Sequence, residues 1–259
     1  MKPNKSKGSV LAFSLGILLI AAFLQAGVLL KGNRIVFPGL QEIWETLVRL
    51  LGDGNTWLKI GTTILHVAEA LILSAVIGIL IGLLEGSSHF AYSFFRPVMI
   101  LIRSIPMIVL VILIMATISY RSVPVVSACM ILIPLFSEAV YEGCYSIDPE
   151  LIDVYRLNGG FSARVVFQVY LPLISGYLKQ AFNNAAGMGI KVAVSAEYLV
   201  QSRDSLGKAV YLSAYSVEYA EVYAYALIMI FLVLLLTELP GKISAFVHQK
   251  RTGKLTSPG

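Results

Sequence analysis

Long apolar runs recur along the chain and constrain its fold more than any other feature. Residues 10–30, 70–84 and 222–239 are almost free of charged side chains, and the whole sequence is 57% hydrophobic and only 14% charged. A soluble domain is nearer half apolar and a quarter charged. Because each helical crossing of a bilayer needs about 20 apolar residues, the pattern predicts an all-α integral membrane protein.

The length of 259 residues accommodates six predicted transmembrane helices. The first run is too long for the apolar part of a signal peptide, so we interpret it as a retained span. Basic residues at both ends predict that the N and C termini lie in the cytoplasm. Both termini on one side require an even number of spans, so we keep the polar fifth span in the count. The six spans are residues 10–30, 57–84, 97–118, 123–140, 171–200 and 222–239.

This topology divides the chain into three parts. Residues 1–56 are predicted to hold the first span and an extracytoplasmic interfacial helix, in which Ile43, Leu47 and Leu50 recur at helical spacing. Residues 57–245 form a five-helix core, and residues 246–259 form a cytoplasmic basic tail. Within the core, the 147–175 connection lies in the cytoplasm, whereas residues 119–122 and 201–217 face outward.

Motifs for soluble or catalytic chemistry are absent from the sequence. No G-x-x-x-x-G-K-[ST] loop, nucleophile elbow or HExxH occurs, so the chain lacks these devices for binding a nucleotide or for hydrolysis. The two cysteines and three histidines do not form a metal-binding pattern. The net charge of +5 lies largely at the termini, which positive-inside orientation explains better than a nucleic-acid partner does.

Three glycines, Gly78, Gly82 and Gly86, follow one another at four-residue spacing in the second predicted span. Small residues at this spacing allow helix backbones to approach closely within a membrane. We therefore expect this face of the helix to pack tightly against a neighbouring span.

A polar segment, DVYRLNGGFSARVVFQVYLP at 153–172, separates the fourth and fifth predicted spans. Gly159 and the glycine after it end a predicted helix over 149–157, capped near Asp148, because glycine readily takes the left-handed C-terminal conformation. A second short helix over 162–169 then leads into the Leu-Pro that opens the next span. The segment is predicted to lie across the cytoplasmic membrane face and to contact a soluble partner.

The spacing in this segment resembles the cytoplasmic signature of binding-protein-dependent ABC transporter permeases, written EAA, three residues, G, nine residues, I-x-L-P. The required five residues lie between the acidic Asp153 and Gly159, and Leu171 and Pro172 close the pattern. The departures are Asp153 for Glu, Val154 and Tyr155 for the two alanines, and Val169 for Ile.

The resemblance implies a type I ABC importer fold in which this segment is the coupling helix, seated in a groove of a separate ATPase subunit. It further implies a dimer of ATPase subunits that holds ATP and Mg²⁺, a second permease copy, an extracytoplasmic binding protein and a bacterial inner-membrane location. No cofactor is expected on this chain itself. The residues expected to serve ATPase coupling are Asp153, Tyr155, Arg156, Asn158, Gly159, Gly160, Leu171 and Pro172.

Three further stretches, at 55–82, 95–106 and 192–214, are similar to permeases for nitrate, alkanesulfonates, taurine and pyrimidine vitamin precursors. The implied solute is therefore a small anion or a vitamin precursor. After the third span this group usually has a W-F-G stretch, whereas the chain reads IMATISYRSVPVV. That departure leaves the individual substrate open.

Ionisable groups inside predicted spans are the candidates for a substrate path, since a charge near the bilayer centre costs about 3 kcal/mol or more. The alternative is internal neutralisation, with Lys191 or Arg203 paired to Glu197 and with Arg103 capping carbonyls freed by Pro106. His66 and Glu69 are predicted to face the bundle near its outer side. The substrate-path candidates are Arg103, Pro106, Lys191, Ser195 and Glu197.

Two other classes of protein fit an apolar chain of this length. A stand-alone channel or secondary transporter would follow ion gradients and would not need the polar segment. An integral membrane enzyme would retain turnover as a single subunit, but the sequence offers no catalytic constellation for it.

Overall fold

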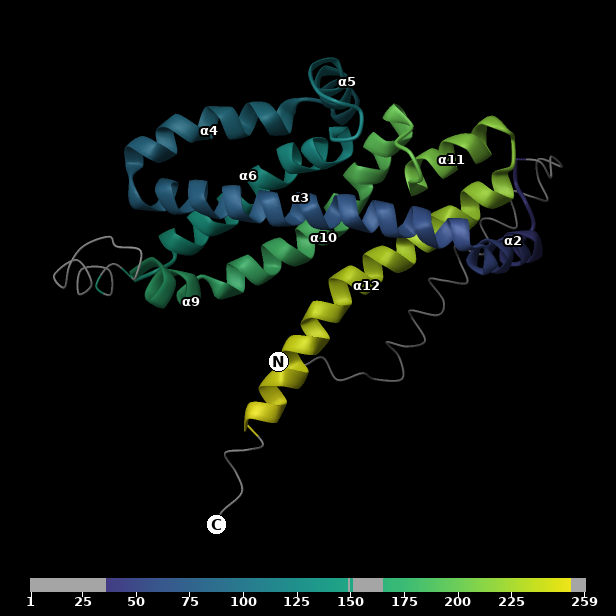
Figure 1. Ribbon diagram of the computed structural model, residues 1–259. Coiled ribbons are helices and arrows are strands. Elements are labelled where there is room, and N and C mark those ends of the chain that lie inside the picture. Colours follow the sequence, from purple (N-terminus) through teal and green to yellow (C-terminus); the bar gives the residue numbers. More distant parts are fainter. Residues whose placement is uncertain (1–35, 149, 151–164, 253–259) are drawn as a thin grey trace, which may run out of the picture.

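The computed structural model describes residues 36–148, 150 and 165–252, and these residues form helices and short connections without a strand (Figure 1). The helices in chain order are α2 (Leu40–Gly52), α3 (Gly54–Ser87), α4 (His89–Ser104), α5 (Met107–Thr117), α6 (Val123–Tyr145), the π-helical turn η1 (Val166–Tyr170), α9 (Leu171–Leu173), α10 (Ser175–Val200), α11 (Leu206–Tyr215) and α12 (Tyr219–Thr252).

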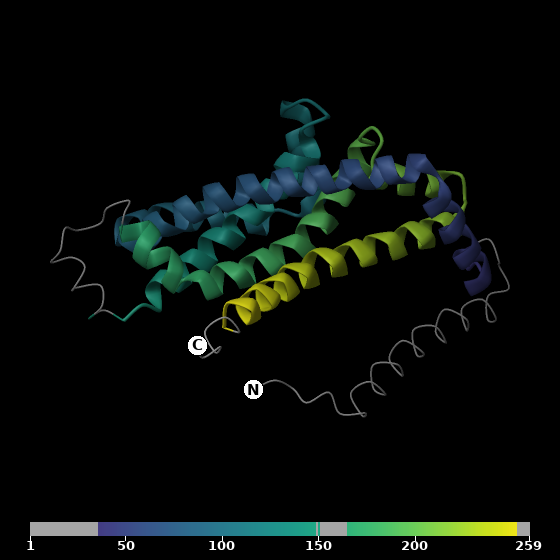
Figure 2. The same ribbon diagram turned by 60° about the horizontal axis from the view of Figure 1, so that its bottom comes forward.

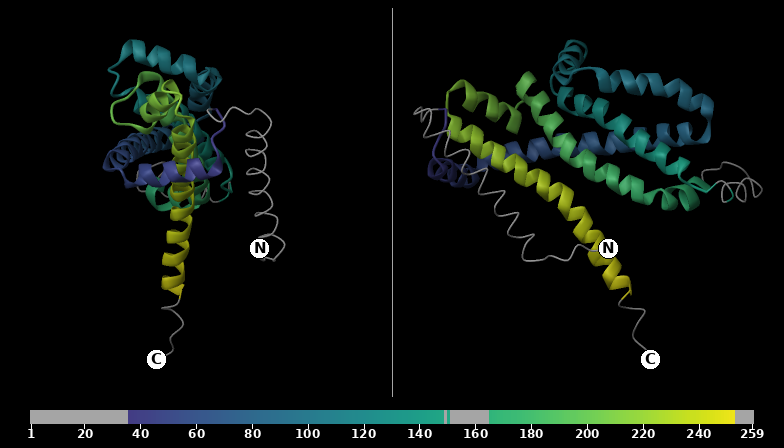
Figure 3. Two further views of the ribbon diagram at one scale, coloured as in Figure 1. Left: turned by 90° about the vertical axis from the view of Figure 1, so that its right-hand side faces the viewer. Right: turned by 180° about the vertical axis from the view of Figure 1, so that it is seen from behind.

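Four long helices, α3, α6, α10 and α12, form the body of the molecule, and α4 covers one side of it (Figures 1 and 2). The α3–α4 junction and α9 lie at one end, whereas α2 and α11 lie at the other. At that second end α2 crosses α12, as the end-on view shows (Figure 3). The chain therefore has a coupling end, defined by α9 and the α3–α4 junction, and an opposite end.

The predicted glycine face of α3 packs directly on α6. A Cβ atom at Gly78 would lie 2.8 Å from the carbonyl oxygen of Ile133, and one at Gly82 would lie 2.5 Å from that of Ser137. At Gly86 the nearest atom would be the Cβ of Cys144, at 2.7 Å. No side chain fits at these distances, so the expectation of close backbone approach is confirmed.

The third predicted span is not one continuous helix, and its predicted bounds are wrong. Helix α4 begins at His89 rather than near 97, and α5 is bent from it by 104°. The break falls at Ile105 and Pro106, and Pro106 becomes the N-cap of α5. Proline lacks a backbone N–H and clashes with the preceding helical turn, which explains why the helix ends there.

Among the described residues, three helices are long and apolar enough to cross a membrane by length and composition, namely α3, α6 and the 219–237 part of α12. A fourth crossing results if the bent α4–α5 pair is one span. Helix α10 has 26 residues but is too polar to be counted with them. The first predicted span lies outside the described residues. The count of six and the cytoplasmic placement of both termini stay predictions.

Helix α12 continues to Thr252 and so passes Pro240, where the sequence predicts its end. A proline inside a membrane helix removes one hydrogen bond, and the rest of the helix can persist around it. The helix therefore ends later than predicted, whereas its apolar candidate span, Tyr219–Thr237, agrees with the predicted span over 222–239.

The predicted interfacial helix is present as α2, and its Ile43, Thr46 and Leu50 are buried. The opposite face exposes Trp44 and Val48. Arg49 forms a 2.9 Å ion pair with Glu221 of α12, which fixes α2 to the bundle. The amphipathic helix is confirmed, and its location at a membrane surface stays a prediction.

Candidate functional site

The predicted coupling segment is described only at its two ends. Asp153, Tyr155, Arg156, Asn158, Gly159 and Gly160 lie outside the described residues. At the entry, Asp148 accepts a 3.0 Å hydrogen bond from the backbone N–H of Glu150, as expected of a helix N-cap. At the exit, the sequence predicts an α-helix over 162–169. The structure instead has a π-helical turn over Val166–Tyr170 that leads directly into α9.

Leu171 and Pro172 belong to α9, directly before Ile174. Ile174 is completely buried, and a Cβ atom at Gly143 of α6 would lie 2.9 Å from its Cβ. Leu83 of α3 belongs to the same apolar cluster. The exit of the coupling segment is therefore packed against both α3 and α6.

Arg103 of α4 reaches across to α6. Its guanidinium donates a 2.8 Å hydrogen bond to the carbonyl oxygen of Pro134 and lies 2.5 Å from a carboxylate oxygen of Glu138. The alternative from the sequence expected Arg103 to cap carbonyl groups freed by Pro106. In the structure the guanidinium instead contacts Pro134 and Glu138. Arg103, three residues before Pro106, therefore connects the end of α4 to the middle of α6.

Glu197 of α10 is completely buried, and three donors converge on its carboxylate. Thr63 donates its hydroxyl at 2.9 Å, Gly207 donates its backbone N–H at 3.1 Å, and His66 lies with Nδ1 at 2.8 Å. In the tautomer with a proton on Nδ1, the imidazole of His66 donates to this carboxylate. Glu197 thus ties α3, α10 and α11 together.

Close backbone approach makes this network possible. Gly207 lies so near the α10 backbone that an added Cβ would collide with the carbonyl oxygen of Val194 and with Glu197. The hydroxyl of Thr63 also accepts from the backbone N–H of Leu206, at 3.0 Å. The S-L-G sequence at 205–207 is therefore needed where α11 meets α10.

The five substrate-path candidates do not come together. Lys191 and Ser195 are exposed on one face of α10, and Ser195 donates to the Lys191 carbonyl oxygen at 2.8 Å. Glu197 is buried on another face, paired with His66 rather than with Lys191 or Arg203. Arg103 and Pro106 belong to the α4–α5 region. Their joint role in a substrate path stays a prediction.

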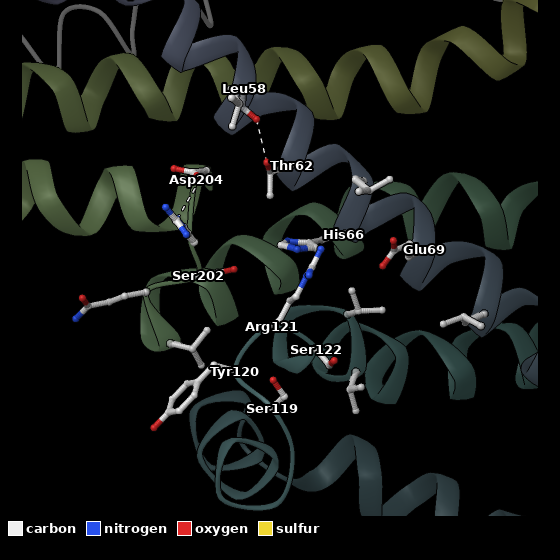
Figure 4. Close-up of a pocket in the computed structure, with 17 residues that line it drawn as sticks. Leu58, Thr62, His66, Glu69, Ser119, Tyr120, Arg121, Ser122, Ser202 and Asp204 are labelled. Atoms are coloured by element: carbon white, nitrogen blue, oxygen red, sulfur yellow. Dashed lines mark hydrogen bonds and ion pairs between the residues drawn. The ribbon is translucent and has the colours of Figure 1, made fainter.

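A cavity of about 1060 Å³ opens instead beside His66, between α3, the 118–122 turn and the 201–205 turn (Figure 4). Hydroxyl groups contribute to its wall from Thr62 and Ser122. Its acidic and basic lining residues are His66, Glu69, Arg121, Arg203 and Asp204. Three other cavities in the described part of the chain have volumes of about 260, 480 and 320 Å³.

Part of this cavity could be anticipated from sequence. Thr62, His66 and Glu69 recur at three- and four-residue spacing, so they share one polar face of α3. Arg121 gives no comparable signal, because an arginine in a four-residue outward turn is an ordinary surface residue. The fold alone brings it to the polar face of α3.

The described residues form an all-helical fold with long apolar helices typical of a membrane protein, and comparison with known proteins specifies its class. Residues 74–251 match the family model described as binding-protein-dependent transport system inner membrane component. Because the match spans more than half of the chain, the protein belongs to that family and is the permease component of an ABC transporter.

Relatives support this assignment. The chain is 26% identical over 174 residues to probable ABC transporter permeases of Brucella melitensis and Brucella abortus, and the match covers 67% of this chain and about 70% of each relative.

Solved structures share the fold at low sequence identity. A bacterial ABC transporter that imports the acidic polysaccharide alginate superposes with a TM-score of 0.64 at 15% identity, over 92% of this chain and 97% of that one. The inward-facing MetNI methionine ABC transporter superposes with a TM-score of 0.55 at 19% identity, over 80% and 95%. The type I permease fold is thereby confirmed.

Proposed function

We propose that this chain is the membrane-spanning subunit of an ATP-driven importer in a bacterial inner membrane, and that it translocates a small solute delivered by an extracytoplasmic binding protein. Sequence resemblance favours a nitrate-, sulfonate- or taurine-like anion or a vitamin precursor. A separate pair of ATPase subunits holds ATP and Mg²⁺. A second copy of this chain completes the translocation path.

The anchoring of the coupling end is the observation that carries this proposal. Ile174 lies against Gly143 of α6 and in one apolar cluster with Leu83 of α3. A force applied at Ile174, near the end of the 147–175 segment, therefore reaches α3, α6 and α10 through packed atoms. Packed interfaces of this kind move as units, which suits a two-state cycle driven from outside.

ATP-driven closure of the partner subunits would move the two coupling segments together and open the path outward. Hydrolysis would reset the assembly. Arg103, through Pro134 and Glu138, joins α4 to the same α6 helix that ends at the coupling segment. The α4–α5 break would follow the motion of α6.

Purification of the wild-type chain with its neighbouring gene products tests the assignment. We expect an ATPase subunit to co-purify, and we expect Gly159→Pro to abolish ATP-dependent solute uptake while the permease remains in the membrane. Absence of an ATPase partner, or full ATP-dependent uptake by the Gly159 variant, would overturn the proposal. Uptake that follows an ion gradient without ATP would establish the transporter alternative.

The anchor allows a second, structure-based test. Gly143→Val places a branched side chain against Ile174, whereas Gly176→Ala meets nothing within 4 Å. We expect Gly143→Val to lower the coupling of ATP hydrolysis to uptake and Gly176→Ala to leave it unchanged. If ATP hydrolysis is coupled to uptake equally well in both variants, the contact between Gly143 and Ile174 has no part in the mechanism.

A further inference from the structure

An exposed carboxylate lies near the middle of a membrane-spanning helix. Glu69 follows the first residue of the 34-residue helix α3 by 15 positions, about 22 Å of helix rise. Its side chain lines the large cavity and forms no ion pair or hydrogen bond with the described residues. Ionisable groups within membrane-spanning helices usually face a water-filled path or a partner.

A cation faces the same cavity from a different wall. Arg121 lies in the turn between α5 and α6, and its side chain extends toward the His66 ring (Figure 4). No carboxylate of the described residues lies within 4.0 Å of it. The cavity therefore holds one acidic and one basic side chain that do not neutralise each other.

The remaining charges of the cavity are already compensated. Arg203 lies 3.6 Å from Asp204, its neighbour in the 201–205 turn. His66 is 8% exposed and is fixed by Glu197 through Nδ1, so the second ring nitrogen is left for the cavity. A buried partner that fixes the orientation of a polar ring is typical of a built binding site.

We propose that the cavity between α3 and the 118–122 and 201–205 turns binds a small zwitterionic solute, with its cationic end at Glu69 and its anionic end at Arg121. The inference rests on the proposed function and narrows it to solutes that carry both charges. A solute with a single charge would leave either Glu69 or Arg121 without a counter-charge. A zwitterion satisfies both at once.

The cavity leaves room for water beside the solute. A volume of about 1060 Å³ exceeds what a small zwitterion fills, so water accompanies the solute and bridges it to the hydroxyls of Thr62 and Ser122. The turns that frame the cavity are the ones predicted to face outward. A solute released by a binding protein would therefore reach this cavity first.

Thermal unfolding of the purified permease–ATPase complex in nanodiscs, without binding protein, tests the site. The probes are glycine, β-alanine, taurine and glycine betaine, compared with propionate, ethanesulfonate and ethylamine. A ligand that binds the folded state raises the melting temperature. We expect at least one zwitterion to raise it at millimolar concentration, and we expect at least tenfold weaker binding of the matched single-charge compounds.

Single substitutions test which residue binds each end of the solute. Glu69→Gln and Arg121→Gln should each weaken zwitterion binding at least tenfold, whereas Glu42→Gln and Lys179→Gln, exposed charges away from the cavity, should leave it unchanged. Binding of none of the zwitterions would overturn the inference, as would anion binding that is insensitive to Glu69→Gln. A complex that hydrolyses ATP and transports solute while failing this test keeps the proposed function and removes only the site.

Discussion

The carboxylate of Glu197 and the imidazole of His66 form a buried contact, 2.8 Å between Oε1 and Nδ1, that joins helices α10 and α3. Thr63 and the N–H of Gly207 occupy the other carboxylate oxygen. One completely buried side chain thus connects the helix that follows the coupling segment to the helix that lines the large cavity. We expect the fold at this end to depend on it.

Glu197→Ala should destabilise the protein by about 3 kcal/mol or more, because three donors would lose their acceptor inside the bundle. Ser195→Ala is the matched control on the same helix: Ser195 is exposed, so its replacement should change stability by about 0.5 kcal/mol or less. Unfolding of the detergent-solubilised protein, followed by circular dichroism, measures both. Similar values for the two variants would contradict the role of the buried network.

Gly82→Ala should destabilise the α3–α6 contact by about 1–3 kcal/mol, since the new methyl group would lie 2.5 Å from the Ser137 carbonyl oxygen. Gly61→Ala on the same helix meets nothing within 4 Å and should stabilise by up to about 1 kcal/mol. Melting temperatures in one detergent give the comparison. If both substitutions stabilise, α3 and α6 are farther apart than described.

The Arg103–Glu138 ion pair should contribute less than about 1 kcal/mol, because both side chains are roughly half exposed, at 42% and 53%. A double-mutant cycle with Arg103→Gln and Glu138→Gln measures the coupling, which should decrease in high salt. Arg103→Gln alone should cost more than Glu138→Gln, since it also removes the bond to Pro134. The reverse order would exclude that bond as the main anchor.

Both tryptophans of the chain should lie at the membrane–water interface. Trp44 and Trp57 are 64% and 58% exposed at the end of the bundle that carries α2. Tryptophan prefers the headgroup level of a bilayer. Single-tryptophan variants made by Trp44→Phe and Trp57→Phe should both be quenched more by lipids brominated near the headgroup than by lipids brominated near the chain ends. Absence of quenching in both would contradict an interfacial α2.

Much of the helical framework follows from the sequence because it depends on local periodicity. The apolar runs predict α3, α6 and α12, and the helical spacing of Ile43 and Leu50 predicts α2. The small-residue spacing at Gly78 and Gly82 predicts the tight face of α3. The helix limits at Pro106 and Pro240 were less predictable. Proline ended one helix and was tolerated in the other, and the difference depends on what surrounds it.

Periodicity and spacing along the chain predict a helical membrane protein, a family signature and a polar face on α3. The packing of distant helices is what pairs Glu197 with His66, 131 positions away, and brings Arg121 and Glu69 to one cavity. Helical patterns repeat every three to four residues and can be read along the chain. Which ionisable side chains come into contact depends on how helices that are distant in the sequence pack, and local sequence patterns do not predict this packing.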